Sequence, residues 1–233
     1  DGSPMKLTIS GFDNTLALPD DGGIATLVIH NDIFFRKIVE GILDMYTKRE
    51  ENNRTVIYNN ENGLLNLTKD TLIVTDLYSY DLSSRTITTA LYKNIQDSSD
   101  LDPIKLAQIE KEILDVLSAI NTGFSQNLNY QTEINIGDIM KMAHVELEAN
   151  TGNNYIDKLY GIIDSAQQLL SKRLVILINQ RQLLSHSELQ ALLQYVQNNH
   201  FSVLFIEKNC KNKLNEENVL VVDDDLYDFS TNS

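Results

Sequence analysis

The feature that most constrains the fold of this chain is a series of short apolar runs separated by segments with helical periodicity. The runs are IATLVI at 24–29, TLIVT at 71–75, LVILI at 174–178, FSVLFI at 201–206 and a shorter one at 219–222. Continuous apolar runs of this length suit strands that are buried on both faces, as in parallel sheets covered by helices. The sequence therefore predicts an α/β fold with a mostly parallel sheet.

A long segment between the second and third runs has a different, helical texture. Apolar residues follow a helical period over 104–120 and again over 155–170, and no convincing strand pattern lies between them. We interpret this segment as an inserted helical subdomain. The predicted organisation is an α/β head of residues 1–100 plus 171–233, and a helical leg of residues 101–170.

Shorter elements complete the prediction. Strands are expected at 6–10, 15–18 and 54–58. Ser185 and Glu188 have the S-x-x-E spacing of a capping box, which predicts the start of a helix. The acidic residues after the last apolar run, Asp223 to Asp225, are predicted to form a frayed tail.

Motifs for catalysis are missing from the sequence. No G-x-x-x-x-G-K-[ST] occurs, and Gly22-Gly23 precedes a strand instead of joining a strand to a helix, so a phosphate cradle is not expected. Ser185-His186 is a poor nucleophile and base pair, because adjacent residues at a helix start rarely converge. Asp76 follows a strand, where a carboxylate commonly bonds neighbouring backbone N–H groups. We therefore predict that the protein is not an enzyme.

Composition bears on location and on binding partners. No apolar run approaches the roughly 20 residues that span a bilayer, no signal peptide follows Met5, and the single cysteine, Cys210, excludes an intrachain disulfide. A cytoplasmic protein with no membrane partner is expected, with Cys210 an idle thiol in a loop. The net charge of −14 argues against nucleic acid when taken alone, but a ring can line its hole with a few basic residues.

Several segments together resemble one known family. IVTDLYSYDLSS at 73–84 resembles that family's V-T-D-[IL]-x-[GS]-Y-D-[VL]-[NS]-S segment, and residues 170–207 follow its order of Lys-rich turn, apolar strand, capped helix and V-L-F-[LI]-E strand. FFRKIV at 34–39 is a weaker match. The chain is thus similar, over nearly its whole length, to the short-form DNA-end-binding protein of type II-A CRISPR systems, an accessory of spacer acquisition.

The resemblance implies both a structure and a function. It implies a head like a P-loop ATPase that lacks the phosphate loop, and a helical leg. It also implies a homotetrameric ring whose basic central hole threads the ends of double-stranded DNA without catalysis. The implied partners are the CRISPR integrase complex and the RNA-guided effector nuclease.

Calcium is the cofactor that the resemblance implies, bound near the bend of the leg. Members of the family carry a denser acidic stretch where this chain has NLNYQTEIN at 127–135. Glu133 and Asp138 are the carboxylates that match, and they are the candidate metal ligands.

Basic pairs supply the candidate DNA contacts. From the pairs at 36–37, 48–49 and 172–173 we select Lys37, Lys48, Lys172 and Arg173 as residues that would contact phosphates. Each pair alone is also compatible with ordinary surface charge, and a track forms only if several align on one face. Two alternatives stay open, a scaffold of the acquisition complex that does not bind DNA and a cryptic NTPase.

Overall fold

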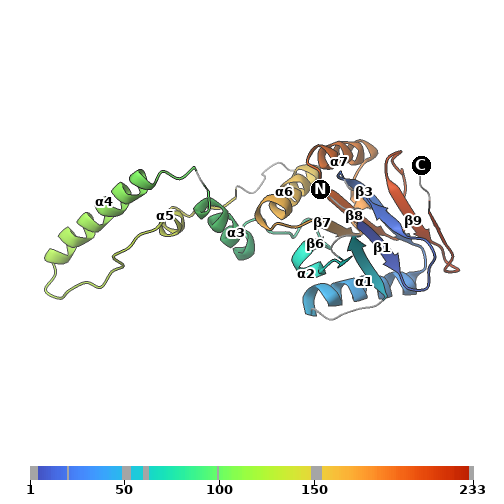
Figure 1. Ribbon diagram of the computed structural model, residues 1–233, viewed down its shortest axis with the longest axis horizontal. Helices are drawn as coiled ribbons and strands as arrows, with labels where there is room; N and C mark the ends of the chain where they lie inside the picture. The colour runs from blue at the N-terminus through green and yellow to red at the C-terminus, as the bar shows by residue number, and fades with distance from the viewer. Residues whose placement is uncertain are drawn as a thin grey trace. The chain divides into compact units, whose positions relative to one another are not determined.

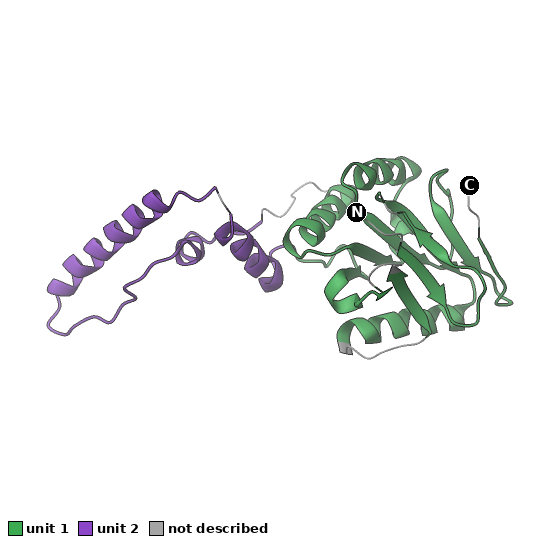
Figure 2. Cartoon of the chain, viewed as in Figure 1, with its two compact units in different colours: residues 1–81, 150–233 green, residues 82–149 purple. Residues whose placement is uncertain are grey.

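The computed structural model describes residues 5–19, 21–48, 54–59, 63–98, 100–147 and 154–230, with only the backbone of Lys48 and Asn59. The chain divides into two compact units, residues 1–81 with 150–233 and residues 82–149, which we call the head and the leg (Figure 2).

The boundaries of the units differ from the predicted ones for two physical reasons. α3 (Arg85–Gln96) packs against α5 (Ile136–Met142), where the Tyr92 hydroxyl donates to the Met140 carbonyl at 3.2 Å, so it belongs to the leg. α6 (Tyr155–Asp164) packs against α7 (His186–Asn198), so it belongs to the head.

A six-stranded sheet forms the centre of the head. Its order is β10-β9-β3-β8-β7-β6, and five of its strands are parallel, which confirms the predicted mostly parallel α/β fold. The strands are β3 (Gly23–Ile29), β6 (Thr71–Val74), β7 (Leu174–Ile178), β8 (Ser202–Glu207), β9 (Asn218–Val222) and the antiparallel β10 (Asp228–Ser230).

A smaller antiparallel sheet, ordered β2-β1-β4-β5, accompanies the large one. Its strands are β1 (Met5–Ile9), β2 (Leu16–Leu18), β4 (Thr55–Asn59) and β5 (Gly63–Leu64). In β1 the side chains alternate between buried and half-buried, the pattern of a sheet with only one face in the core. The sequence predicted β1, β2 and β4. It did not predict that they form a separate sheet.

The main core lies between the two sheets. Leu7 of β1, Leu27 of β3 and Ile176 of β7 are fully buried in it, together with Ile38 of α1 (Asp32–Lys48). The short helix α2 (Leu67–Asp70) packs against α1. The opposite face of the large sheet is covered by α6, its π-helical continuation Ser165–Leu169 and α7 (Figure 1).

The leg consists of α3, α4 (Pro103–Thr122) and α5. Asp102 caps α4 by accepting from the backbone N–H of Ile104 at 3.0 Å, and Pro103 occupies the first turn. Within the described range 100–147, none of the 20 residues of α4 is buried. Among the described residues, no helix is both long enough and apolar enough to traverse a bilayer.

Residues 223–230 do not form the frayed tail that the acidic residues Asp223 to Asp225 predict. The Asp223 carboxylate accepts from the backbone N–H groups of Asp225 and Tyr227 at 3.0 and 2.8 Å, and this turn leads into β10. The Asp228 carboxylate then accepts from the backbone and side-chain amides of Asn14, at 2.8 and 3.0 Å. Backbone pairing and this contact with the N-terminal segment order residues that charge alone would leave solvated.

Candidate nucleic-acid interface

Lys172, one of the four predicted DNA contacts, is hydrogen-bonded to the end of α2. Its ammonium donates to the backbone carbonyls of Thr68 at 2.8 Å and Lys69 at 2.9 Å, where α2 ends. Burial lowers the pKa of Lys172, while the nearby Asp70 carboxylate opposes that shift. An ammonium has three donors, so one of them is left for a phosphate oxygen.

Arg173 and the end of α1 meet at the same short helix. The backbone N–H of Arg173 donates to the Asp70 carbonyl at 2.8 Å, and the Thr68 hydroxyl donates to the Tyr46 carbonyl at 2.9 Å. Tyr46 lies in the last turn of α1, two residues before Lys48. The backbones that carry three of the predicted contacts are therefore brought together around α2.

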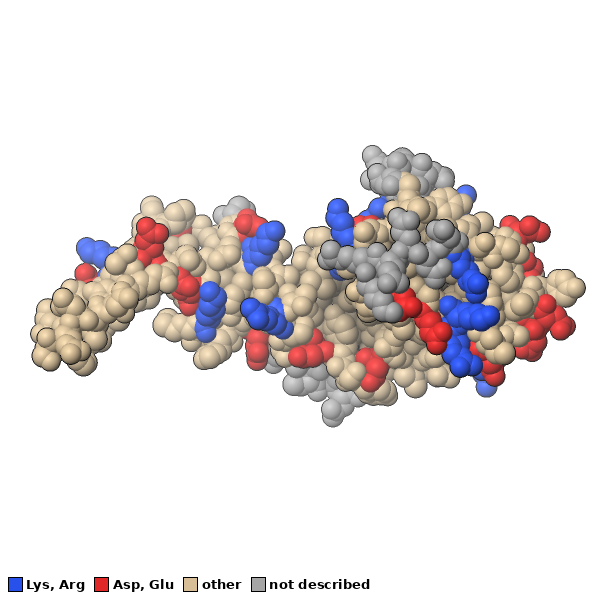
Figure 3. Space-filling view, turned by 90° about the horizontal axis from the view of Figure 1, so that it is seen from below, with Lys and Arg blue, Asp and Glu red and all other residues tan. Residues whose placement is uncertain are grey.

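Lys37 lies farther along α1 and is exposed. Eleven residues separate it from Lys48, or about 16 Å of helix. Arg36 beside it is also exposed, and so is the acidic Glu40. Figure 3 views the head from the side where α1 lies, and Lys and Arg side chains gather there, while Asp and Glu side chains gather toward the end that carries β9.

The carboxyl ends of the parallel strands, where α/β proteins usually bind nucleotides, lack a phosphate loop. Only His30 and Asn31 connect β3 to α1. The Asn31 side chain accepts from the Phe34 N–H at 2.9 Å and donates to the Asp224 carbonyl at 3.1 Å. The start of α1 is thus bonded to the chain itself.

Gln180 follows β7 at the same edge of the sheet. Its side-chain oxygen accepts from the Tyr155 hydroxyl at 2.8 Å and from the Leu77 N–H at 3.2 Å. Its amide nitrogen donates to the carbonyls of Thr75 and Ile178 at 2.8 and 3.0 Å. One buried amide thereby joins the ends of β6 and β7 to α6.

The carboxylate of Asp76 has the structural role that the sequence favours. It accepts from the backbone N–H groups of Tyr78 at 2.9 Å and Ser79 at 3.4 Å. A side-chain hydrogen bond from Ser79, together with those backbone bonds, lowers the pKa of Asp76. The lowered pKa makes this carboxylate a weaker base than a free Asp side chain.

Ser185 and His186 also match the structural interpretation. The Ser185 hydroxyl accepts from the Glu188 N–H at 3.3 Å, and the Glu188 carboxylate accepts from the Ser185 N–H at 2.8 Å. This is the predicted capping box at the start of α7. His186 is an exposed residue of the first turn.

A buried ion pair that sequence reasoning missed organises the loop between β8 and β9. The Arg181 guanidinium donates to both carboxylate oxygens of Glu217, at 2.7 and 3.1 Å, and to the carbonyls of Lys211 and Asn212. Both side chains are at most 3% exposed. The Thr26 hydroxyl donates to the same carboxylate. No motif signals the pair, because its members are far apart in the sequence.

Glu207 and Cys210 lie close to this pair. The Glu207 carboxylate accepts from the backbone N–H of Arg181 at 2.8 Å, and burial raises its pKa to about 7. Cys210 is half-buried against a cluster that contains Val28 and Val219, and burial also raises the pKa of its thiol. The charges of Arg181, Glu217 and Glu207 all act on the pKa of Cys210, which places the thiol beside the buried pair.

The two candidate calcium ligands lie in the leg. Asp138 belongs to the capping box of α5, where its carboxylate accepts from the Asn135 N–H at 3.2 Å and the Gln131 side chain at 3.0 Å. The bond from Asn135 is the main reason that the pKa of Asp138 is lowered. Glu133 is exposed. Within the described part of the chain, no group of three or more His, Cys, Asp or Glu residues could hold a metal ion.

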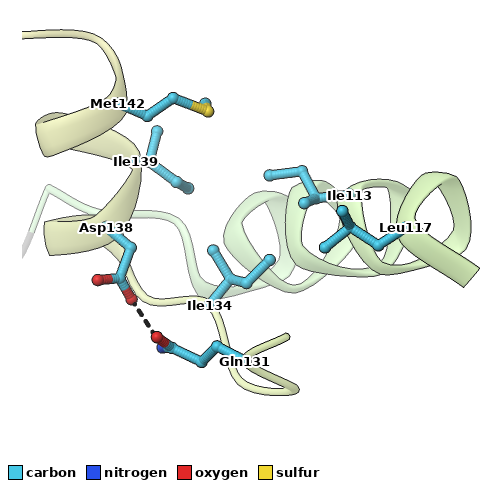
Figure 4. A pocket seen from close by; sticks show the side chains of 7 residues that line it. All are labelled: Ile113, Leu117, Gln131, Ile134, Asp138, Ile139 and Met142. Atoms are coloured by element: carbon cyan, nitrogen blue, oxygen red, sulfur yellow. Dashed lines mark hydrogen bonds between the residues drawn. The ribbon is translucent and has the colours of Figure 1, made fainter. Parts of the chain in front are cut away.

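An apolar groove of about 230 Å³ lies beside Asp138 (Figure 4). Ile113 and Leu117 of α4 form one wall, and Ile134, Ile139 and Met142 form the other. Calcium takes six to eight oxygen ligands. The hydrocarbon lining and the already bonded Asp138 therefore fit a calcium ion poorly.

Comparison with known proteins identifies relatives over most of the chain. A model of the family described as CRISPR-associated protein (Cas_Csn2) matches residues 48–226. A CRISPR-associated protein Csn2 from Streptococcus agalactiae is 22% identical over 206 residues, which cover 87% of this chain and 89% of that protein. A Csn2 protein from Enterococcus faecalis is 24% identical over 138 residues, 58% of this chain and 63% of that one.

Solved structures share the fold at low identity. Stu0660 of Streptococcus thermophilus has a TM-score of 0.56 and 14% identity, covering 93% of this chain and 74% of that one. CbiO1 from Clostridium perfringens, part of the ABC transporter complex cbiONQ, has a TM-score of 0.50 and 10% identity, covering 95% and 85%. The second likeness confirms the predicted similarity to a P-loop ATPase fold. The family model matches more than half of the residues of this chain, so the chain belongs to the Csn2 family of CRISPR-associated proteins.

Proposed function

We propose that this protein binds the ends of double-stranded DNA as a homotetrameric ring and supports CRISPR spacer acquisition without catalysing a reaction. Membership in the Csn2 family is the observation that carries the proposal. The protein would act in the cytoplasm with the integrase complex and the effector nuclease, which its family resemblance implies as partners.

Self-association is supported by a partly exposed apolar stripe on α4. Leu106, Ile109, Ile113, Val116 and Ile120 follow one another at spacings of three and four residues, the repeat that brings helices together side by side. Ile109, Val116 and Ile120 expose 40%, 59% and 46% of their surface. A second copy of the leg would cover this stripe and make ring assembly favourable.

DNA binding is supported by the basic residues around α1 and α2. Lys37, Lys48, Lys172 and Arg173 would contact phosphates and leave the bases unread, so binding would not depend on sequence. The carboxylates toward β9 would stay outside the hole, which reconciles DNA binding with the net charge of −14. The two-residue connection between β3 and α1 disfavours the alternative of a cryptic NTPase.

The test of end binding is a mobility shift with linear and closed circular duplexes of the same sequence. We expect retention of the linear form, with an affinity that falls by about 10³-fold or more between 50 and 200 mM salt if six or more phosphates are neutralised. Equal retention of both forms would refute threading. No retention at low salt would favour the scaffold that does not bind DNA.

A matched pair of charge reversals locates the contact surface. Lys37→Glu changes an exposed residue of α1, and Lys211→Glu changes an exposed residue of the loop between β8 and β9. The first should weaken DNA binding and reduce the salt dependence by about one unit per lost phosphate contact, while the second should leave both unchanged. Equal effects of the two reversals would show that only net charge matters.

A further inference from the structure

The loop between β8 and β9 is held in place by a buried network centred on Arg181 and Glu217. The Arg181 guanidinium donates to the carbonyl of Lys211 at 2.6 Å and to that of Asn212 at 3.1 Å. The Glu217 carboxylate accepts from the Leu214 N–H at 3.0 Å and from the Arg181 guanidinium. Backbone groups from three positions of the loop are therefore bonded to one ion pair, so the closed loop depends on the charges around that pair.

Cys210 shows what the closed loop covers. It is half-buried against Val28 of β3 and against Val219 and Val221 of β9, which form a buried apolar cluster. It is also the single cysteine of the chain. Opening of the loop exposes the thiol, and a thiol reagent therefore reports on the state of the loop.

Two carboxyl groups share the one guanidinium of this network. Glu207 is 2% exposed, Glu217 is fully buried and Arg181 is 3% exposed. Four of the five donors of Arg181 are used by Glu217 and by the loop carbonyls, whereas the Glu207 carboxyl accepts from the backbone N–H of Arg181 at 2.8 Å. A second buried negative charge without a cation of its own is unfavourable. The closed loop therefore favours a protonated Glu207, in agreement with its raised pKa of about 7.

Two other titratable groups near Glu207 are uncharged at neutral pH. Burial raises the pKa of the Tyr155 hydroxyl on α6 and the pKa of the Cys210 thiol, and the charge of Glu207 adds to both shifts. A phenol and a thiol that are neutral near pH 7 supply no positive charge, so neither can balance an ionised Glu207.

The lysines of the loop lie toward solvent. Lys208 pairs with Asp32, and the side chains of Lys211 and Lys213 are exposed. Water and salt screen charges in such positions. Among the described residues of this network, Arg181 is therefore the buried cation on which both carboxyl groups depend.

We propose that the loop between β8 and β9 is a pH-sensitive switch, which is closed while Glu207 is protonated and opens more readily once its carboxylate is ionised. Opening brings water to the carboxylate and uncovers Cys210. The pKa of Glu207 is about 7 in the closed loop and returns toward the ordinary 4.5 when water reaches it, so the open population grows as pH rises from 4.5 and levels off above 7. The proposal does not depend on DNA binding.

The test follows the reaction of Cys210 with 4,4′-dithiodipyridine in the full chain between pH 5 and pH 8. The Glu207→Gln variant is the matched control, because it keeps the same thiol and an acceptor for the Arg181 N–H but does not ionise. We expect the rate in the wild type, divided by the rate in the variant, to rise by about tenfold or more between pH 5 and pH 7 and to level off above pH 7. A ratio that stays constant with pH would overturn the proposal.

A second thiol separates loop opening from unfolding of the whole chain. Cys210→Ser with Ser165→Cys moves the thiol to a residue that is 3% exposed in the π-helical continuation of α6. We expect this thiol to react more slowly than Cys210 at pH 7, and low urea to leave the Cys210 rate nearly unchanged, since local opening exposes little surface. Equal rates for the two thiols, both with the urea dependence of global unfolding, would contradict the switch, because the loop would then open only with the rest of the protein.

Discussion

The Arg181 side chain stabilises the loop between β8 and β9 through several hydrogen bonds. Its guanidinium joins the end of β7 to Lys211, Asn212 and Glu217, in a loop that covers part of the sheet without a helix. The five donors of an arginine suit this task, because they satisfy carbonyls and a carboxylate at once. The pair is buried, so each partner depends on the other.

Loss of the Arg181 charge should therefore be costly. Arg181→Met leaves the Glu217 carboxylate buried without a cation, and we expect the free energy of unfolding to fall by about 3–5 kcal/mol in urea denaturation. Lys208→Met is the control, since it breaks the more exposed pair with Asp32, which should contribute about 0–1 kcal/mol. A loss below about 1 kcal/mol for Arg181→Met would mean that the loop does not need the pair.

Glu207 should make stability depend on pH. Burial raises its pKa from 4.5 to about 7, so between these values the folded protein keeps a proton that the unfolded chain has lost. Stability from this group is complete below pH 4.5 and is lost as pH rises through 7, by an amount on the order of 3 kcal/mol.

The Glu207→Gln variant isolates that effect, because glutamine keeps an acceptor for the Arg181 N–H and does not ionise. Its free energy of unfolding relative to the wild type should rise between pH 5 and pH 8, as measured by urea denaturation at both values. A difference that stays constant with pH would show that the carboxyl group is not held protonated.

At the scale of the elements, α4 is a described helix that exposes apolar side chains along one stripe. Val116→Glu with Ile120→Glu places charges on its exposed apolar stripe, and we expect a smaller native mass with unchanged helicity. The substituted side chains are exposed, so the fold should tolerate them. Ala107→Glu with Ser118→Glu adds the same charges at exposed positions outside the stripe and should keep the native mass. Identical masses for the two variants would exclude α4 from the interface.

Sequence patterns predicted the elements whose burial is uniform or strictly periodic. β7 is apolar throughout and lies between two neighbours, and α7 has a capping box and one apolar face. β10 was missed because Asp228 and Ser230 have low strand propensity, and pairing with β9 decides its structure. The Arg181 pair was missed because long-range contacts leave no local pattern in the sequence. Lys172 was selected from its charge, and the structure shows that its ammonium also donates to two backbone carbonyls.

At the scale of the whole molecule, the question is whether a metal ion supports the assembly. Because Asp138 is already bonded and the described residues offer no cluster of three or more ligands, we expect the native mass to be the same with and without EGTA. Dissociation by EGTA that calcium reverses and magnesium does not would show instead that calcium supports the assembly. Glu133→Gln with Asp138→Asn should then dissociate the assembly in the same way.

The two-residue connection from β3 to α1 also limits whether substitutions could create a nucleotide-binding site here. A nucleotide-binding motif of this kind spans eight residues, and only His30 and Asn31 are present here. Exchange of side chains does not lengthen a backbone, so a phosphate loop at this position would require an insertion of several residues and release of Asn31 from Asp224. Point substitutions alone therefore leave this protein without a loop that could hold a nucleotide's phosphates.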